Sequence, residues 1–171
     1  IYKETLQTIQ TEHHSLFTKI IQYISEIDII STSCFLAKKY NYCKPNITSS
    51  TSFVKATGIR HPIIERICTK TPYTKNDITL SQSGILLYGL NSSGKSSLLR
   101  TIGTNIVLAQ VGMYVNSDTF HFYPFQRCIT KIATTDDMFR GQSTFIVEMN
   151  ELREILNTSD KNTLILCDEL T

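Results

Sequence analysis

Long apolar runs and an excess of either charge are both missing from this 171-residue sequence. No stretch approaches the roughly 18 consecutive apolar residues of a transmembrane helix, so no membrane span is expected. The 17 lysines and arginines nearly balance the 15 aspartates and glutamates, and a formal charge of +2 gives no evidence for a general polyanion-binding protein. With 41% hydrophobic and 19% charged residues, the composition excludes wholesale disorder.

Paired cysteines are missing as well. The five cysteines form no C-x-x-C pair and no cysteine–histidine spacing of the kind that ligates zinc. Their odd number and the absence of a secretory hydrophobic segment predict reduced, mostly buried thiols in an intracellular protein. The cytoplasm, the nucleus, an organelle and a viral factory all remain open as its location.

The first 40 residues predict a long amphipathic helix. Its apolar residues recur at spacings of mostly three, four and one: Leu6, Ile9, Leu16, Phe17, Ile20, Ile21, Ile24, Ile27 and Ile30. Such a helix has no core of its own, so we expect it to pack against segments that are partly missing. The chain begins at Ile1 and ends at Thr171, directly after an acidic pair, and we interpret both ends as cuts.

The middle of the chain predicts a domain boundary followed by short strands. Residues 41–52 read as a loop, because Pro45 and a cluster of serines and threonines interrupt any regular pattern. Three β-like runs separated by glycine and proline follow, at Phe53–Ala56, Ile63–Cys68 and Ile78–Leu80.

From Ile85 onward the pattern alternates between strand and helix. A buried strand is expected at Ile85–Tyr88, a helix at about 96–111 with Gly112 as its C′ residue, and a second helix from about Ser143. Mixed β-like segments lie between the helices at Phe120–Phe125 and Cys128–Ala133, and an apolar strand is expected at Thr163–Cys167. This alternation predicts an α/β layer structure with a parallel component.

The turn between the first strand and helix of this region carries a phosphate-binding motif. It matches G-x-x-x-x-G-K-[ST] in every fixed position: Gly89, Leu90, Asn91, Ser92, Ser93, Gly94, Lys95 and Ser96. Gly94 lets the backbone approach phosphates without a Cβ in the way, and the N–H groups of the loop form an anion nest at a helix N-terminus. Lys95 can then reach the β- and γ-phosphates, and the Ser96 hydroxyl can ligate Mg²⁺.

A second acidic element follows the last apolar strand. Asp168 and Glu169 stand where P-loop enzymes hold magnesium and orient the attacking water, 73 residues after Lys95. The kinase H-R-D segment and the dinucleotide fingerprint G-x-G-x-x-G are absent. A Gly-Gln-Ser-Thr turn that opens a helix before the acidic pair points to ATPases of the ABC type, in which one subunit completes the γ-phosphate site of another.

The ordered motifs of this chain resemble the MutS family of DNA mismatch-repair ATPases. The resemblance spans almost the whole sequence and rests on these blocks: Asp28-Ile29-Ile30, Asn41-Tyr42-Cys43-Lys44-Pro45, Gly58-Ile59-Arg60-His61-Pro62, the P-loop, Asp136-Asp137, Gly141-Gln142-Ser143-Thr144-Phe145-Ile146-Val147-Glu148-Met149 and Asp168-Glu169. The variable P-loop positions differ from those of many relatives, which suggests a divergent branch of giant-virus or organellar type.

The resemblance implies a domain organisation and further site residues. Residues 1–45 would be the end of the helical core and lever region, and residues 46–171 the first part of an ABC-type ATPase domain with a mixed sheet and flanking helices. Tyr73 would stack on adenine, Ser97 would join the P-loop ligands, and Ser143 would touch the γ-phosphate of the partner subunit's ATP. The position of Gln142 commonly carries a basic residue in bacterial relatives, so the resemblance does not extend to a phosphate contact from this side chain.

The resemblance also implies the function. Lys95 and Glu169 would act in catalysis, Ser96 and Asp168 would hold Mg²⁺, and ATP would be hydrolysed in a full-length homo- or heterodimer. The nucleotide state would control a clamp on mismatched DNA and its handover to a downstream repair factor, with DNA contacted through parts outside this sequence and no membrane involved. Three alternatives stay open: a MutS-related protein that senses ATP at recombination junctions without mismatch recognition, another ABC-type ATPase, and an inactive fragment that binds nucleotide without hydrolysing it.

Overall fold

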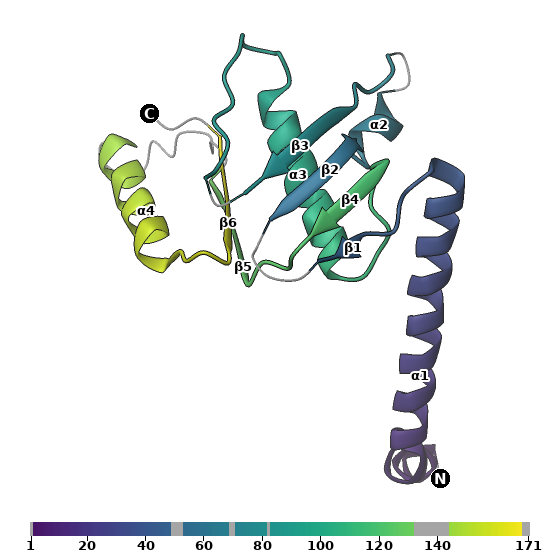
Figure 1. Cartoon of the computed structure of the whole chain (residues 1–171). Helices are drawn as coiled ribbons and strands as arrows, with labels where there is room; N and C mark the ends of the chain where they lie inside the picture. The colour runs from purple at the N-terminus through teal and green to yellow at the C-terminus, as the bar shows by residue number, and fades with distance from the viewer. Residues whose placement is uncertain (1, 49–52, 69–70, 82, 132–143, 169–171) are drawn as a thin grey trace. The chain divides into compact units, whose positions relative to one another are not determined.

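The computed structural model describes residues 2–48, 53–68, 71–81, 83–131 and 144–168. The chain divides into two compact units, Ile1–Tyr40 and Asn41–Thr171, which are drawn together in Figure 1. Each unit is described by itself.

The first unit is one helix, α1 (Tyr2–Tyr40), as the periodicity predicts. All nine residues of the predicted apolar stripe are exposed, from 40% at Ile9 to 64% at Ile21. The hydroxyls of Thr11, Thr18 and Ser25 donate to carbonyl oxygens one turn earlier, which satisfies them within the helix. The helix therefore keeps its apolar stripe uncovered within its own unit.

The same helix corrects the membrane argument made from unbroken apolar runs. Thr5–Tyr40 contains an 18-residue window of mean hydropathy 1.3, so by length and composition alone it is apolar enough to cross a membrane. Amphipathic helices that pack on other protein segments meet the same criterion. Glu12, Lys19 and Glu26 lie within this segment, as in a helix with one polar face.

A four-stranded mixed sheet forms the centre of the second unit. Its order is β1 (Asn46–Ile47), β4 (Thr119–Phe122), β2 (Val54–Ile59), β3 (Asn76–Leu80). The strands β3 and β4 pair antiparallel with β2, whereas β1 runs parallel to β4. The runs expected around Phe53–Ala56 and Ile78–Leu80 thus lie in strands, and the first half of Phe120–Phe125 lies in β4.

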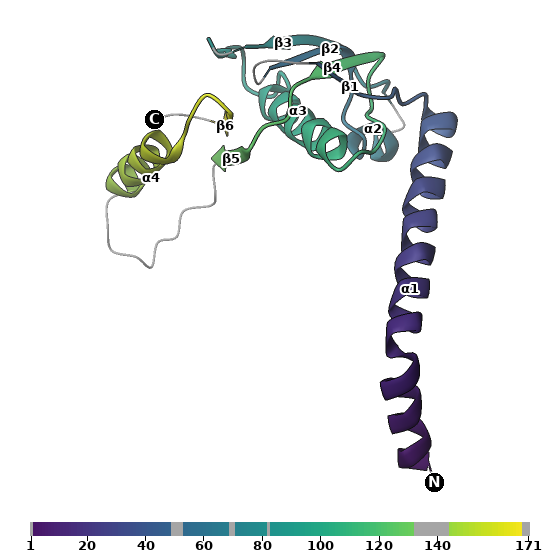
Figure 2. The same ribbon diagram turned by 60° about the horizontal axis from the view of Figure 1, so that its bottom comes forward.

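The helix α3 (Lys95–Gln110) covers one face of this sheet (Figures 1 and 2). Its inward residues pack against alternating residues of β2 and β4, and the core they form includes Ile102, Ile106, Ala109, Val54, Ala56, Phe120 and Phe122. Burial of a side chain such as Phe120 contributes roughly 1.5–3 kcal/mol. The packing of α3 on the sheet therefore holds its N-terminus, where the P-loop ends, in one place.

The helix α3 stops where the sequence predicts. Gly112 has φ +82°, its N–H donates to the Ala109 carbonyl at 3.1 Å, and the Met113 N–H donates to the Leu108 carbonyl at 2.9 Å. These two bonds are the Schellman arrangement, which satisfies carbonyls left open at a helix end.

A second sheet carries the acidic C-terminal residues. Here β5 (Arg127–Lys131) runs parallel to β6 (Thr163–Cys167), and α4 (Thr144–Thr158) lies between them in the sequence. Leu164 and Leu166 of β6 are buried in the core that α3 also enters. A Cβ at Gly103 of α3 would stand 2.8 Å from Leu166 Cδ1, so α3 and β6 approach closely there.

The expected strand at Ile63–Cys68 is wrong, because this segment forms a short helix, α2 (Ile64–Ile67). The cause is local capping: His61 Nδ1 accepts the backbone N–H groups of Ile63 and Ile64, both at 3.2 Å. The Glu65 N–H donates to the His61 carbonyl at 3.1 Å. These N–H groups, which a strand would donate to a neighbouring strand, are therefore already bonded to His61 within one helical turn.

The expected buried strand at Ile85–Tyr88 is also not formed. Leu86 is 86% exposed and Tyr88 92% exposed, and none of the described strands pairs with this segment. A strand exists only through hydrogen bonds to a neighbour, which an apolar sequence alone cannot supply. The residues directly before the P-loop therefore belong to no strand within the described part of the chain.

A buried polar cluster of Arg60, Asn105 and Asn116 joins α3 to the ends of β2 and β4. Asn105 Nδ2 donates to the Arg60 carbonyl at 3.0 Å, and Asn105 Oδ1 accepts the Asn116 N–H at 2.8 Å. The Arg60 guanidinium donates to Asn116 Oδ1 at 2.9 Å and lies 3.2 Å from the Glu65 carboxylate. Because every one of these groups is paired, the cluster stabilises the position of α3 instead of weakening the core.

Candidate nucleotide-binding site

The P-loop turns sharply into α3 at Gly94. This residue is the N-cap of α3 with φ +96°, and Ser92 two residues earlier has φ +66°. A glycine adopts such a conformation without the steric cost that a side chain adds. The first turn of α3 therefore begins directly at Lys95, with its N–H groups directed out of the helix start.

The Lys95 ammonium group folds back over the loop. Its Nζ donates to the carbonyl oxygens of Gly89, at 2.9 Å, and Leu90, at 3.0 Å. The positive charge thus lies beside the N-terminus of α3, whose dipole adds positive potential at the same place. An anion bound in the loop would meet both.

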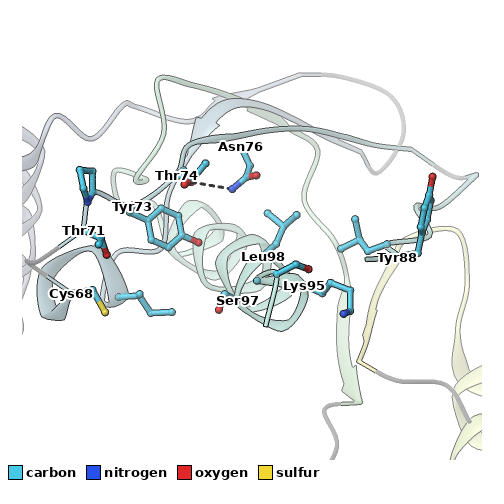
Figure 3. Close-up of a pocket in the computed structure, with 14 residues that line it drawn as sticks. Cys68, Thr71, Tyr73, Thr74, Asn76, Tyr88, Lys95, Ser97 and Leu98 are labelled. Atoms are coloured by element: carbon cyan, nitrogen blue, oxygen red, sulfur yellow. Dashed lines mark hydrogen bonds between the residues drawn. The ribbon is translucent and has the colours of Figure 1, made fainter. Parts of the chain in front are cut away.

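One cavity of about 490 Å³ connects the P-loop with Tyr73 (Figure 3). Its P-loop side is formed by Ser93, Gly94 and Lys95 of the motif and by Ser97, which follows the motif in the first turn of α3. Its other side is formed by residues around Tyr73, which precedes Lys95 by 22 positions in the sequence. The fold therefore brings two predicted parts of one site to a common space.

Tyr73 reaches the cavity from irregular chain just before β3. Its hydroxyl oxygen lies 2.8 Å from Thr101 Oγ1 on α3, and its side chain is half-buried. In Figure 3 the Tyr73 ring stands between Thr71 and the start of α3.

Several predicted residues lie away from this cavity or outside the described residues. Gly89, Leu90, Asn91 and Ser92 belong to the exposed loop and do not line it, and neither does Ser96 in the first turn of α3. Asp168 follows β6, where its backbone N–H donates to the Lys131 carbonyl at 2.7 Å. Glu169 and Ser143 lie outside the described residues, as do the Asp136-Asp137 and Gly141-Gln142 blocks.

Sequence reasoning missed most of the cavity wall. Its further members come from α2 and its C-cap, the chain before β3, the first residue of β3, the chain before the P-loop, and α3: Ile64, Cys68, Thr71, Pro72, Thr74, Asn76, Leu87, Tyr88 and Leu98. They carry no common motif, and only their proximity in the fold unites them. The one signal available was Thr71-Pro72 directly before Tyr73.

Two ionisable groups near this wall have shifted pKa values. Burial, with a smaller contribution from the nearby Arg100 cation, holds the pKa of His61 below its ordinary value. His61 therefore stays neutral, as it must to accept two N–H groups at the start of α2. A hydrogen bond from Lys75 lowers the pKa of Asp118, and Arg60 contributes in the same direction.

The loop turns at a glycine into a helix N-terminus, a lysine lies over it, and an aromatic ring lines the same cavity. These features define a P-loop nucleotide-binding domain. Residues 85–171 match the family model described as MutS domain V. The chain is 38% identical over 174 residues to the mitochondrial DNA mismatch repair protein mutS homolog of Sarcophyton glaucum, covering 99% of the chain and 18% of the relative.

Other relatives give the same result. A putative DNA mismatch repair protein mutS homolog of Acanthamoeba polyphaga mimivirus is 32% identical over 207 residues, covering 98% of the chain and 18% of the relative. The DNA mismatch repair protein MutS of Fusobacterium nucleatum is 34% identical over 172 residues, covering 99% of the chain and 19% of the relative. The chain belongs to the MutS family, and its second half lies in domain V, the ATPase domain of these proteins. It spans about a fifth of the length of the curated relatives it matches.

Proposed function

We propose that this chain supplies one half of an ATP-hydrolysing site in a MutS-type mismatch-repair protein. The observation that carries the proposal is the single cavity lined both by the P-loop residues Ser93–Lys95 and by Tyr73. A nucleoside triphosphate needs such a space, because its phosphates and its base must be bound at the same time.

At the phosphate end, Lys95 would exchange two neutral acceptors for a negatively charged one. Its ammonium now donates to the carbonyls of Gly89 and Leu90. These bonds have a charged donor but neutral acceptors, whereas a phosphate oxygen also carries negative charge, so a bound triphosphate would draw Lys95 away from the carbonyls. The N–H groups at the start of α3 and the loop residues 89–94 would hold the same phosphates.

The oxygen donors of Ser96 and Asp168 fit Mg²⁺, which prefers hydroxyl and carboxylate oxygens and keeps several waters. Ser96 stands in the first turn of α3 and Asp168 directly after β6, and these two elements meet at Gly103 and Leu166. Bound there, the metal would neutralise charge on the β- and γ-phosphates.

Hydrolysis would follow the general scheme for phosphoryl transfer. Water attacks the γ-phosphorus, the bond to the bridging oxygen of ADP breaks, and Glu169 accepts the proton that the water loses. Lys95 stabilises charge on the phosphate oxygens during transfer. Ser143 of each subunit would act on the γ-phosphate held by the other, so turnover would require the dimer.

In the whole protein, residues 46–171 would be the first part of the ATPase domain and residues 1–45 the end of the helical core and lever region. The nucleotide state would then control a clamp on mismatched duplex DNA and the recruitment of a downstream repair factor. These roles depend on parts of the protein beyond the described cavity.

The test is to replace Lys95 by alanine in the full-length protein and to measure ATP binding by calorimetry. We expect a loss of affinity of at least about a hundredfold, because a charge-assisted contact to phosphate and its support of the loop are both removed. Lys55→Ala is the matched control, since Lys55 is exposed on β2 and does not line the cavity. Equal ATP affinity in Lys95→Ala and Lys55→Ala would overturn the phosphate assignment.

A further inference from the structure

The phenol of Tyr73 is hydrogen-bonded to α3, the helix that begins at the P-loop. Its oxygen lies 2.8 Å from Oγ1 of Thr101, which stands six residues after Lys95 on α3. Thr101 is completely buried, and its Oγ1 also donates to the Ser97 carbonyl at 2.7 Å.

The direction of the hydrogen bond follows from a proton count. A threonine hydroxyl has one proton, and that of Thr101 is used by the Ser97 carbonyl. The Tyr73 hydroxyl must therefore donate to Thr101 Oγ1. With its single proton used in this way, the phenol offers its ring to a ligand in the cavity but no hydroxyl donor.

The backbone around Thr101 is held on its other side too. The Thr101 carbonyl accepts from Asn105 Nδ2 at 2.9 Å, and Asn105 is tied to Arg60 and Asn116 in the buried polar cluster. Tyr73, by contrast, lies in irregular chain before β3, and none of the strand pairings among the described residues includes it. The hydrogen bond from the Tyr73 hydroxyl to Thr101 therefore holds the Tyr73 side chain against α3.

We propose that Thr101 is a positioning residue that sets the place of the base-stacking ring relative to the P-loop. This inference rests on the proposed function, because it takes Tyr73 as the ring that stacks on the base. Since Thr101 and Lys95 belong to one rigid helix, their spacing fixes the separation of the base and phosphate subsites. The residue therefore contributes to the base-dependent part of nucleotide binding and not to phosphate binding itself.

The experiment compares two ligands that share phosphates and differ in the base: ATP and inorganic tripolyphosphate. In the full-length protein, Thr101→Val should weaken ATP binding about two- to tenfold, the range for one lost hydrogen bond, and leave tripolyphosphate binding unchanged. Thr101→Ser keeps the hydroxyl and should restore ATP binding. Thr104→Val is the matched control on the same helix, since Thr104 is half-buried and does not line the cavity.

A double-mutant cycle identifies the bond itself. Tyr73→Phe should weaken ATP binding as much as Thr101→Val does, and the double variant should be no weaker than either single variant. Alkylation of Cys68 gives a second readout, because this exposed thiol lines the Tyr73 side of the cavity. ATP at saturating concentration should protect Cys68 less in Thr101→Val than in the wild type, with the exposed Cys34 on α1 as the internal reference.

Two results would overturn the inference. One is an equal loss of affinity for tripolyphosphate and for ATP in Thr101→Val relative to the wild type, which would mean a general loss of structure. The other is an ATP affinity of Thr101→Val that lies within twofold of the ATP affinity of Thr104→Val. Failure of the proposed function is distinct, because in that case the wild-type protein would bind neither ligand, or Lys95→Ala would bind both normally.

Discussion

The two ends of the cavity are built in different ways. The proposed phosphate end is lined by neighbouring residues of one loop and helix start, Ser93, Gly94, Lys95 and Ser97. Its bonds are local, because Lys95 donates to carbonyls five and six positions away. The base end comes from separate segments, and Tyr73 depends on Thr101, 28 positions away. Behind it, Arg60 and Asn116 bond across 56 positions and Asn105 and Arg60 across 45.

Because the two ends are built differently, different substitutions should disturb each of them. A local loop is disturbed chiefly by changes within its own few residues, since its geometry comes from backbone conformation and a helix start. A wall assembled over long distances depends on buried polar groups that touch no ligand. Substitutions at those groups should separate the two ends of the site.

The largest effect is expected from Asn105→Leu. This change leaves the buried Asn116 N–H and the Arg60 carbonyl without the amide that pairs them, which costs about 2–4 kcal/mol of stability. Hydrogen exchange of the α3 amides in the full-length protein measures the loss.

Asn150→Leu serves as the control for Asn105→Leu, because Asn150 is exposed on α4. The comparison further predicts that Asn105→Leu weakens ATP binding more than tripolyphosphate binding. An equal loss for both ligands would show that the two ends are not separable in this way.

A smaller effect is expected from alanine at either end of α3. Gly94 and Gly112 both have positive φ, +96° and +82°, and a Cβ at either would meet open space. Gly94→Ala and Gly112→Ala should therefore cost similar amounts, about 1–2 kcal/mol, through backbone conformation alone. Only Gly94→Ala should weaken tripolyphosphate binding, by about tenfold, which calorimetry would measure. If Gly112→Ala weakened tripolyphosphate binding equally, the phosphate site would depend on helix stability and not on the loop.

The smallest effect is a dependence on pH through His61. Its folded pKa lies below the unfolded value of 6.5, so its stabilisation is complete above that value and is lost as the pH falls through the folded pKa. Protonation of Nδ1 removes the acceptor for the Ile63 and Ile64 N–H groups, which should loosen α2 at the base end.

The pH prediction is checked by hydrogen exchange of the α2 amides and by ATP affinity between pH 7.5 and about 5. His61→Asn retains an oxygen acceptor that does not titrate in this range, so its α2 protection should stay level. Because the terminal phosphates of ATP and tripolyphosphate both titrate at about pH 6, the readout is the ratio of the ATP affinity to the tripolyphosphate affinity. This ratio should fall below pH 6.5 in the wild type and stay level in His61→Asn if α2 affects only the base end.

Sequence patterns located the elements whose determinants are local or periodic. The apolar spacing predicted α1 and α3, Gly112 predicted the end of α3, and Thr163–Cys167 coincides with β6. The same kind of reasoning failed at Ile63–Cys68 and Ile85–Tyr88, where apolar and β-branched residues suggested strands. At the first, a histidine side chain captured the backbone donors; at the second, no described strand supplies a partner.

The amino-acid sequence alone sufficed to predict the family, the P-loop and its glycine turn, because these depend on residue identities a few positions apart. Three features became visible only in the folded chain: Tyr73 shares a cavity with Lys95, its hydroxyl bonds to Thr101, and the side chains of Arg60, Asn105 and Asn116 pair in the core. The two groups of features differ in the range of the interactions that form them. A turn or a helix start is set by the conformation of adjacent residues, whereas a buried donor finds its acceptor only after the packing of α3 on the sheet has brought distant segments together.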